Sequence, residues 1–180
     1  MIFSIVGIIV LLTFEACYAG PPVSDDQLHP LPLELYVPVL EVLDGGTFKT
    51  VLPSGIPINV HFLVVDCPDK VNTNKPKNFM NISKLVLKEW GLYARDWLKE
   101  EIEGEWVTIR FDNISGVKGS FGRILAYAID DGVNLNTELL RLGLARAIPK
   151  YDFWLKDQYV NLQEVAVTGR VGVWGELPAS

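Results

Sequence analysis

Residues 60–69 read VHFLVVDCPD, and this stretch predicts a buried strand that runs into a pair of carboxylates. The first six residues are apolar except for His61 and are rich in β-branched side chains, which suits a strand buried on at least one face. Asp66 ends this run, and Pro68 cannot continue it in a central ladder. A carboxylate at the end of a stiff strand, followed by a rigid turn and by Asp69, suits a hard cation such as Ca²⁺. The simpler interpretation is that Asp66 and Asp69 only cap and solvate a turn.

The rest of the pattern places this strand third in a small β-rich fold. Short apolar runs separated by turn residues predict strands, and apolar residues at helical spacing predict amphipathic helices. In chain order they are two strands within residues 33–52, broken by Asp44-Gly45-Gly46, a strand over 56–65, a helix over 85–102, strands over 106–111 and 123–129, and helices over 136–148 and 151–168. This order indicates an α+β, β-rich fold, a five-stranded OB-type β-barrel with three helices.

The composition restricts the partners. A chain of 180 residues is expected to form one domain, and we expect a monomer. Its formal net charge of −6 argues against strong bulk affinity for nucleic acid, which comes mostly from Lys and Arg contacts to phosphates. Any anion-binding site must therefore be local.

The N-terminal residues predict a secreted or extracytoplasmic protein. Residues 1–19 are mostly apolar and contain no Lys or Arg, as expected of a signal peptide, and residues 20–32 hold four of the eleven prolines, as expected of a tether. The domain would then span 33–180, with no membrane contact after cleavage. An uncleaved membrane anchor and a lipidated Cys17 are the alternatives. Cleavage would remove Glu15, change the net charge from −6 to −5 and leave only Cys67, so no intramolecular disulfide could form.

Seven short motifs in this order resemble the staphylococcal nuclease, or thermonuclease-like, family. The resemblance covers residues 36–176. The motifs are VLDGGTF at 42–48, LVVDCPD at 63–69, GLYA at 91–94, FGRILAY at 121–127, LN at 135–136, GLA at 143–145 and GVW at 172–174.

The resemblance implies a Ca²⁺ site that is incomplete in this chain. In the family the ion is held by aspartates of an Asp-Gly-Asp-Thr turn and of a Val-Asp-Thr-Pro-Glu turn. Asp66 matches one of them, Asp44 matches an outer, supporting position, and Cys67 supplies a backbone carbonyl. Gly46 replaces the other aspartate, so Ca²⁺ binding is expected to be weak or lost. Asp44, Asp66 and Asp69 are nevertheless expected to form a three-carboxylate cluster.

The resemblance also implies the catalytic residues. Arg123 matches an arginine that neutralises the charge on the attacked phosphate. Asp69 matches the glutamate that positions the attacking water, with a side chain one methylene shorter. His61 replaces a second arginine and cannot make the same bidentate phosphate contact, so its alternative role is that of a packed core residue. Tyr151 and Phe121 match positions that contact the nucleotide.

Two functions remain open from the sequence. The first is a secreted phosphodiesterase acting on single-stranded DNA or RNA, impaired by the two missing charges. The second is a non-catalytic OB-type module that binds nucleic acid, carbohydrate or protein through the same face.

We predict that the mature protein begins at Gly20, because the small residues before it fit a signal-peptidase site. N-terminal sequencing of the secreted product tests this. A retained Met1 would indicate a membrane anchor instead, and a lipid on Cys17 would indicate a lipoprotein.

Overall fold

The computed structural model describes residues 34–71, 74–115, 119 and 122–176. The predicted signal peptide, the predicted tether and Phe121 lie outside these residues. Among the described residues, no helix combines the length and the apolar character that a membrane span requires. The elements in chain order are β1 (Glu34–Pro38), β2 (Glu41–Asp44), β3 (Thr47–Val51), β4 (Pro57–Phe62), β5 (Val65–Asp66), the 3-10 helix η1 (Pro76–Phe79), α2 (Lys84–Ile102), β6 (Trp106–Arg110), β7 (Ile124–Asp130), β8 (Val133–Asn134), α3 (Leu135–Arg141), β9 (Arg146–Ala147), α4 (Lys156–Thr168) and the 3-10 helix η3 (Gly172–Trp174).

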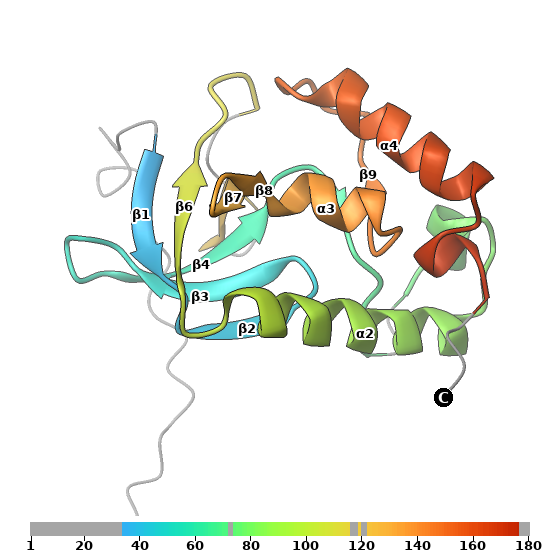
Figure 1. Cartoon of the computed structure of the whole chain (residues 1–180), viewed down its shortest axis with the longest axis horizontal. Coiled ribbons are helices and arrows are strands. Elements are labelled where there is room, and N and C mark those ends of the chain that lie inside the picture. Colours follow the sequence, from blue (N-terminus) through green and yellow to red (C-terminus); the bar gives the residue numbers. More distant parts are fainter. Residues whose placement is uncertain (1–33, 72–73, 116–118, 120–121, 177–180) are drawn as a thin grey trace, which may run out of the picture.

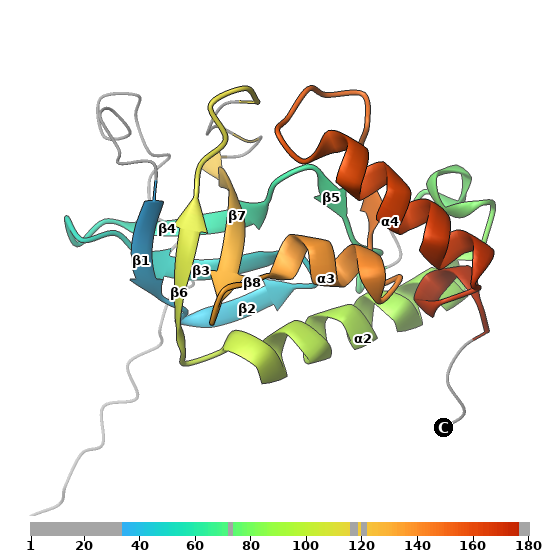
Figure 2. The same cartoon turned by 45° about the horizontal axis from the view of Figure 1, so that its top comes forward.

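The strands form one curved sheet in the order β1-β6-β7-β4-β3-β2, with β8 added to β7 (Figures 1 and 2). All pairings in it are antiparallel except that of β4 with β7. The two ends of this path, β1 and β2, are consecutive in the chain, so the sheet wraps around a core although no ladder joins these two strands in the described part. The predicted α+β, OB-like fold with three helices is confirmed, but its sheet is not closed by hydrogen bonds.

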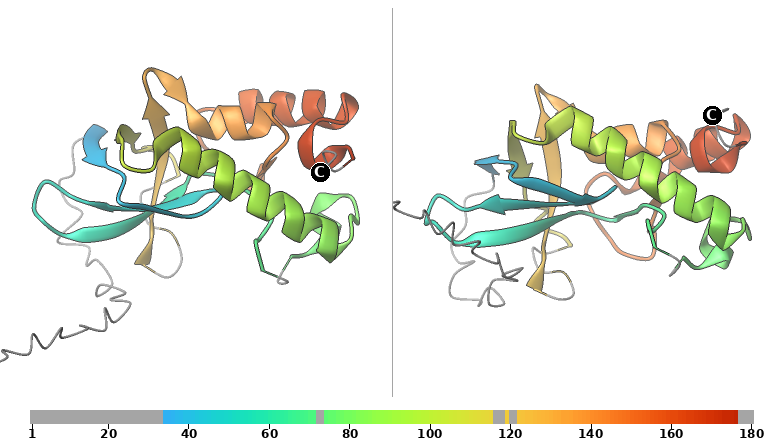
Figure 3. Two further views of the ribbon diagram at one scale, coloured as in Figure 1. Left: turned by 60° about the horizontal axis from the view of Figure 1, so that its bottom comes forward. Right: turned by 90° about the horizontal axis from the view of Figure 1, so that it is seen from below.

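The long helix α2 covers one side of the sheet and reaches past it toward η3 (Figure 3). Its side chains Leu87, Leu98 and Ile102 are fully buried in the core. Ser83 caps the helix, because its side chain accepts a hydrogen bond from the Val86 N–H. Before this N-terminal end of the helix, Phe79 of η1 stacks on Trp174 of η3 with ring centroids 5.8 Å apart. The sheet and the C-terminal helices therefore share one core.

Strand β4 directs the side chain of His61 away from its core-facing residues. Its buried residues alternate along the strand, and Val60 and Phe62 are fully buried. Because successive side chains of a strand point to opposite faces, His61 points away from them. The alternation in the sequence thus places His61 on the face that forms the site.

The predicted strand over 56–65 is interrupted. It ends at Phe62, the chain turns at Leu63 and Val64, and Val64 has a left-handed φ of 56°. The buried side chain of Asn136 donates a hydrogen bond to the Leu63 carbonyl at 3.2 Å, which fixes this turn. The chain then forms β5, so Asp66 ends a separate short strand.

The predicted helices over 136–148 and 151–168 are shorter than expected. Gly143 has a φ of 64°, and a Cβ there would lie 2.1 Å from the Val171 carbonyl oxygen, so α3 ends before it. The following residues form β9, which pairs with β5. Helix α4 begins only at Lys156, and the Trp154 N–H just before it donates a hydrogen bond to the Asp112 carboxylate at 2.9 Å.

Asp112 joins three segments near the site. Its carboxylate accepts hydrogen bonds from the N–H groups of Ile114 and Ser115, from the Tyr127 hydroxyl at 2.6 Å and from the Trp154 N–H. Asp112 is 3% exposed, and burial alone would raise the pKa of its carboxyl group. The hydrogen bonds outweigh burial and lower this pKa. The charged carboxylate therefore stabilises the fold.

We predict that Asp112→Asn lowers the free energy of unfolding at pH 7 by about 3 kcal/mol, since it removes a charge that several hydrogen bonds require. Because the folded pKa is lower than the unfolded one, this contribution is present above about pH 4 and is lost as the pH falls through the folded pKa. Urea unfolding at pH 7 and pH 3 tests this, with the exposed Asp131→Asn as the control within about 0.5 kcal/mol of the wild type. Equal stability of Asp112→Asn and the wild type at pH 7 would contradict the assignment.

Candidate active site

The turn between β2 and β3 packs against helix α2 and is hydrogen-bonded to Cys67. Asp44 accepts a hydrogen bond from the Gly46 N–H at 2.9 Å, and the Cys67 thiol donates to the Gly45 carbonyl at 3.1 Å. A Cβ on Gly45 would lie 2.7 Å from the Cβ of Ala94, so only glycine allows this approach to the helix. The turn therefore lies beside the residues that follow β5.

Gly46 leaves open the position that the resemblance assigns to a carboxylate. A Cβ there would lie 3.7 Å from Cys67 Sγ and 3.9 Å from His61 Cε1, which are ordinary contact distances. A side chain at position 46 would thus reach the space between Cys67 and His61 without displacing the backbone.

Cys67 is a thiol at neutral pH. Burial raises the pKa of this thiol well above its usual value, and the carboxylates of Asp44 and Asp66 raise it further. Because metals bind the thiolate, the sulfur is not suited as a ligand here. Cys67 could therefore offer a metal ion only its backbone carbonyl, the ligand that the resemblance implies.

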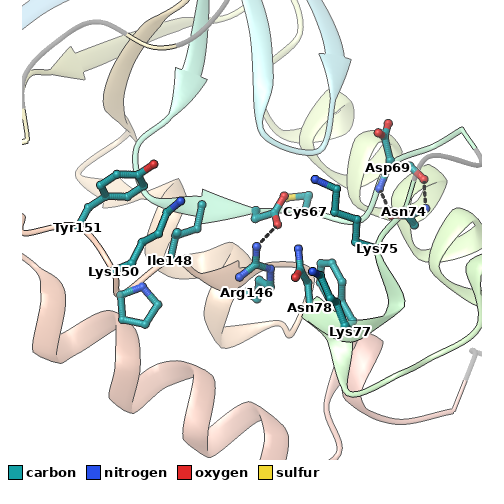
Figure 4. Close-up of a pocket in the computed structure, with 13 residues that line it drawn as sticks. Cys67, Asp69, Asn74, Lys75, Lys77, Asn78, Arg146, Ile148, Lys150 and Tyr151 are labelled. Atoms are coloured by element: carbon teal, nitrogen blue, oxygen red, sulfur yellow. Dashed lines mark hydrogen bonds and ion pairs between the residues drawn. The ribbon is translucent and has the colours of Figure 1, made fainter.

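Asp66 is held by an arginine. Strand β5 pairs with β9 so that Asp66 lies opposite Arg146, and Arg146 Nη2 lies 2.5 Å from Asp66 Oδ2 (Figure 4). The guanidinium also lies over the Phe79 ring, with Cζ 5.7 Å from its centroid. Sequence reasoning missed Arg146, because the helix predicted over 136–148 concealed that this residue belongs to a strand; its place directly after the GLA motif at 143–145 was the available signal.

Asp69 is fixed through its backbone. Its N–H donates to Asn74 Oδ1 at 2.6 Å, and Asn74 Nδ2 donates to its carbonyl at 2.7 Å. A Cβ on Gly91 of α2 would lie 2.6 Å from the Asp69 carbonyl carbon, so the chain packs tightly there. Figure 4 shows Asp69 beside Asn74, on the opposite side of the cleft from Tyr151. The buried Asn74 was missed in the sequence because nothing distinguishes it within a polar loop.

The predicted three-carboxylate cluster is wrong. Among the residues that the structure describes, no three His, Cys, Asp or Glu side chains are grouped so that they could hold a metal ion. Asp66 is engaged by Arg146, Asp69 is exposed beside Asn74, and Asp44 binds its own turn. The side chains present therefore do not fit a Ca²⁺ ion, which takes six to eight oxygen ligands.

His61 is a neutral imidazole next to an arginine. Its Nδ1 lies 2.8 Å from the Thr47 hydroxyl, which fixes the ring. Burial lowers the pKa of His61 and the charge of Arg123 lowers it further, while Asp44 and Asp66 act in the opposite direction. A neutral imidazole can accept a proton, whereas the arginine that it replaces cannot.

Two adjoining clefts bring the predicted residues together. The first, of about 710 Å³, is lined by Asp66, Cys67 and Asp69 among others, and the second, of about 560 Å³, by His61, Arg123 and Tyr151 among others. Tyr151 and Ile148 line both clefts, so they form the boundary between them. Asp44 lines neither cleft.

The first cleft is cationic although the chain is acidic. Four cations and two carboxylates line it, and one of the cations, Lys150, lies with Nζ 4.6 Å from the centroid of the Tyr151 ring. The four cations are Lys75, Lys77, Arg146 and Lys150. The local charge thus favours an anionic ligand.

Comparison with known proteins shows which family this chain resembles. The family described as Staphylococcal nuclease homologue matches residues 59–176. An uncharacterized protein of Methanocaldococcus jannaschii is 34% identical over 149 residues, which cover 77% of this chain and 71% of that protein. Endonuclease YncB of Bacillus subtilis is 28% identical over 160 residues, covering 88% of this chain and 68% of that protein. The SPbeta prophage-derived endonuclease YokF of the same species is 26% identical over 136 residues, covering 74% and 42%.

We predict that His61 titrates below the usual histidine pKa of about 6.5 and that Arg123→Met raises its pKa, because one of the two causes that lower it is removed. An NMR titration of the His61 ring protons measures both values. An unchanged pKa in Arg123→Met would show that the two side chains do not interact.

Proposed function

Since the chain belongs to the staphylococcal nuclease family, we propose that it binds single-stranded DNA or RNA along its two clefts and hydrolyses a phosphodiester bond there at a low rate. The observation that carries this proposal is that His61, Arg123 and Tyr151 line one cleft that adjoins a cationic one. The names of the two Bacillus subtilis endonucleases agree with a nucleic-acid substrate.

Each of the three residues has a distinct task in this proposal. The Arg123 guanidinium donates hydrogen bonds to the phosphate and stabilises the charge that grows on it. The neutral His61 imidazole can make one hydrogen bond to the phosphate, a weaker contact than the bidentate one of the arginine that it replaces. Tyr151, at the boundary of both clefts, stacks on a base, a contact that tolerates any sequence and requires an unpaired strand.

Three features of the site support a low rate. Gly46 lacks a carboxylate, His61 lacks the positive charge of an arginine, and Asp66 is neutralised by Arg146. Removing one electrostatic stabiliser from such a site costs about 10²–10³ in rate. We therefore propose that Ca²⁺ binding is weak or lost.

A second candidate is a non-catalytic binding module. The ion pair of Asp66 with Arg146 favours it, because it occupies the one aspartate that matches a direct metal ligand. Binding without hydrolysis would then be the whole function of the two clefts.

We also propose that the protein acts outside the cytoplasm. The apolar residues 1–19 and the proline-rich residues 20–32 support this location.

We predict that Gly46→Asp combined with His61→Arg raises the rate on single-stranded DNA by about 10² for each restored electrostatic contact, because both groups act on the same phosphate. The gain requires Ca²⁺ and exceeds the product of the two single effects. A Cβ at position 46 meets only ordinary contact distances, and the fold of each variant is checked by circular dichroism before the assay. The wild type, both single variants and the double variant are assayed with Ca²⁺ and with chelator.

Asp66→Asn in the double variant is the control, since it removes the remaining direct carboxylate ligand and must abolish the gain. A folded double variant that stays inactive would favour the binding module. A wild type that is already fast would show that the losses at Gly46 and His61 do not limit the reaction.

A further inference from the structure

Arg146 is the cation of the first cleft whose position is fixed by the most contacts. Its strand partner is Asp66, its guanidinium is paired with that carboxylate, and it lies over the Phe79 ring. The side chain is 20% exposed, so it is largely buried but still lines the cleft. Its charge is therefore held in place before any ligand binds.

The backbone that carries Arg146 is also fixed. The next residue, Ala147, pairs with Val65 and donates its N–H to the Gln163 side chain of α4 at 2.7 Å. Strand β9 is thus held between β5 and α4. A guanidinium on such a support loses little conformational entropy when it binds a ligand.

The charges around Arg146 leave it able to attract an anion. Its Nη2 is paired with Asp66, whereas its Nε is buried and has no hydrogen-bond partner among the described residues. Lys75, Lys77 and Lys150 line the same cleft, so the cations outnumber the carboxylates by two. A phosphate that entered the cleft would meet one fixed guanidinium and three flexible ammonium groups.

We propose that Arg146 is the built-in cation of this site, in place of a divalent metal ion, and that it binds a phosphate of a single-stranded nucleic acid without any metal. The inference takes its ligand class from the proposed function but does not require hydrolysis. It also follows that Arg146 competes with divalent cations for Asp66.

The first test is binding of a fluorescent oligothymidylate, measured by anisotropy in chelator over a range of salt concentrations. Arg146→Met is expected to weaken binding about tenfold and to lower the slope of log K against log salt by about 0.7, the value for one lost phosphate contact on a single strand. Arg146→Lys retains the charge and is expected to bind more tightly than Arg146→Met.

Arg141→Met is the matched control. Arg141 also forms an ion pair, with Glu138 at 2.5 Å, but its side chain is 58% exposed and lines neither of the two clefts. The variant loses the same charge and the same kind of ion pair, so its affinity and its salt slope are expected to equal those of the wild type.

The second test is calorimetric titration with Ca²⁺. Arg146→Met is expected to bind Ca²⁺ several-fold more tightly than the wild type, because Asp66 loses its competing partner. A purely structural ion pair would lower the unfolding midpoint of Arg146→Met and leave both binding measurements unchanged.

Two results would overturn the inference: a wild type that binds the oligonucleotide only with Ca²⁺, or an Arg146→Met variant with wild-type affinity and salt slope. These outcomes are separate from hydrolysis. If the protein cleaves nucleic acid but its binding does not depend on Arg146, the inference is refuted and the proposed function stands. If binding depends on Arg146 but no variant cleaves, the inference stands and the proposed hydrolysis is refuted.

Discussion

The short ladder between β5 and β9 is the constraint on which the site depends. Its two strands carry Asp66, shortly after β4 in the chain, and Arg146, shortly after α3. The ladder thus connects the β-rich half of the molecule with its C-terminal helices. The ladder forms because the chain leaves β4 at Leu63 and because Gly143 ends α3 early enough for residues 146–147 to return. Had α3 continued as far as Ile148, residue 146 would be helical and could not pair with Asp66.

The sequence predicted the features that depend on local pattern. Helical spacing predicted α2 to within one residue, and the Asp44-Gly45-Gly46 turn lies where two apolar runs are separated. The OB-like order of elements and the family followed from these. Each of these features is determined by residues close to one another in the chain.

The features that the sequence did not reveal depend on pairs of residues that are distant in the chain or lack a distinctive pattern. Asp112 binds Trp154 across 42 positions, and Arg146 binds Asp66 across 80. Asn74 is buried within a polar loop and binds the backbone of Asp69, which no periodicity indicates. The expected carboxylate cluster failed for the same reason, since nearness in the fold had been inferred from strand ends alone, without the partners that engage each carboxylate.

The departures at Gly46 and His61 compensate each other in charge. Gly46 in place of an aspartate removes a negative charge, and His61 in place of an arginine removes a positive one. A negative charge restored alone at position 46 would lie near Asp44 and Asp66, whose fields already reach Cys67 and His61. A positive charge restored alone at position 61 would face Arg123, which already lowers the pKa of the imidazole there. Each single reversal therefore creates repulsion between like charges, whereas the two together restore balance. Arg146 adds to this balance by neutralising the partly exposed Asp66 carboxylate. The site is thus internally consistent without a divalent ion.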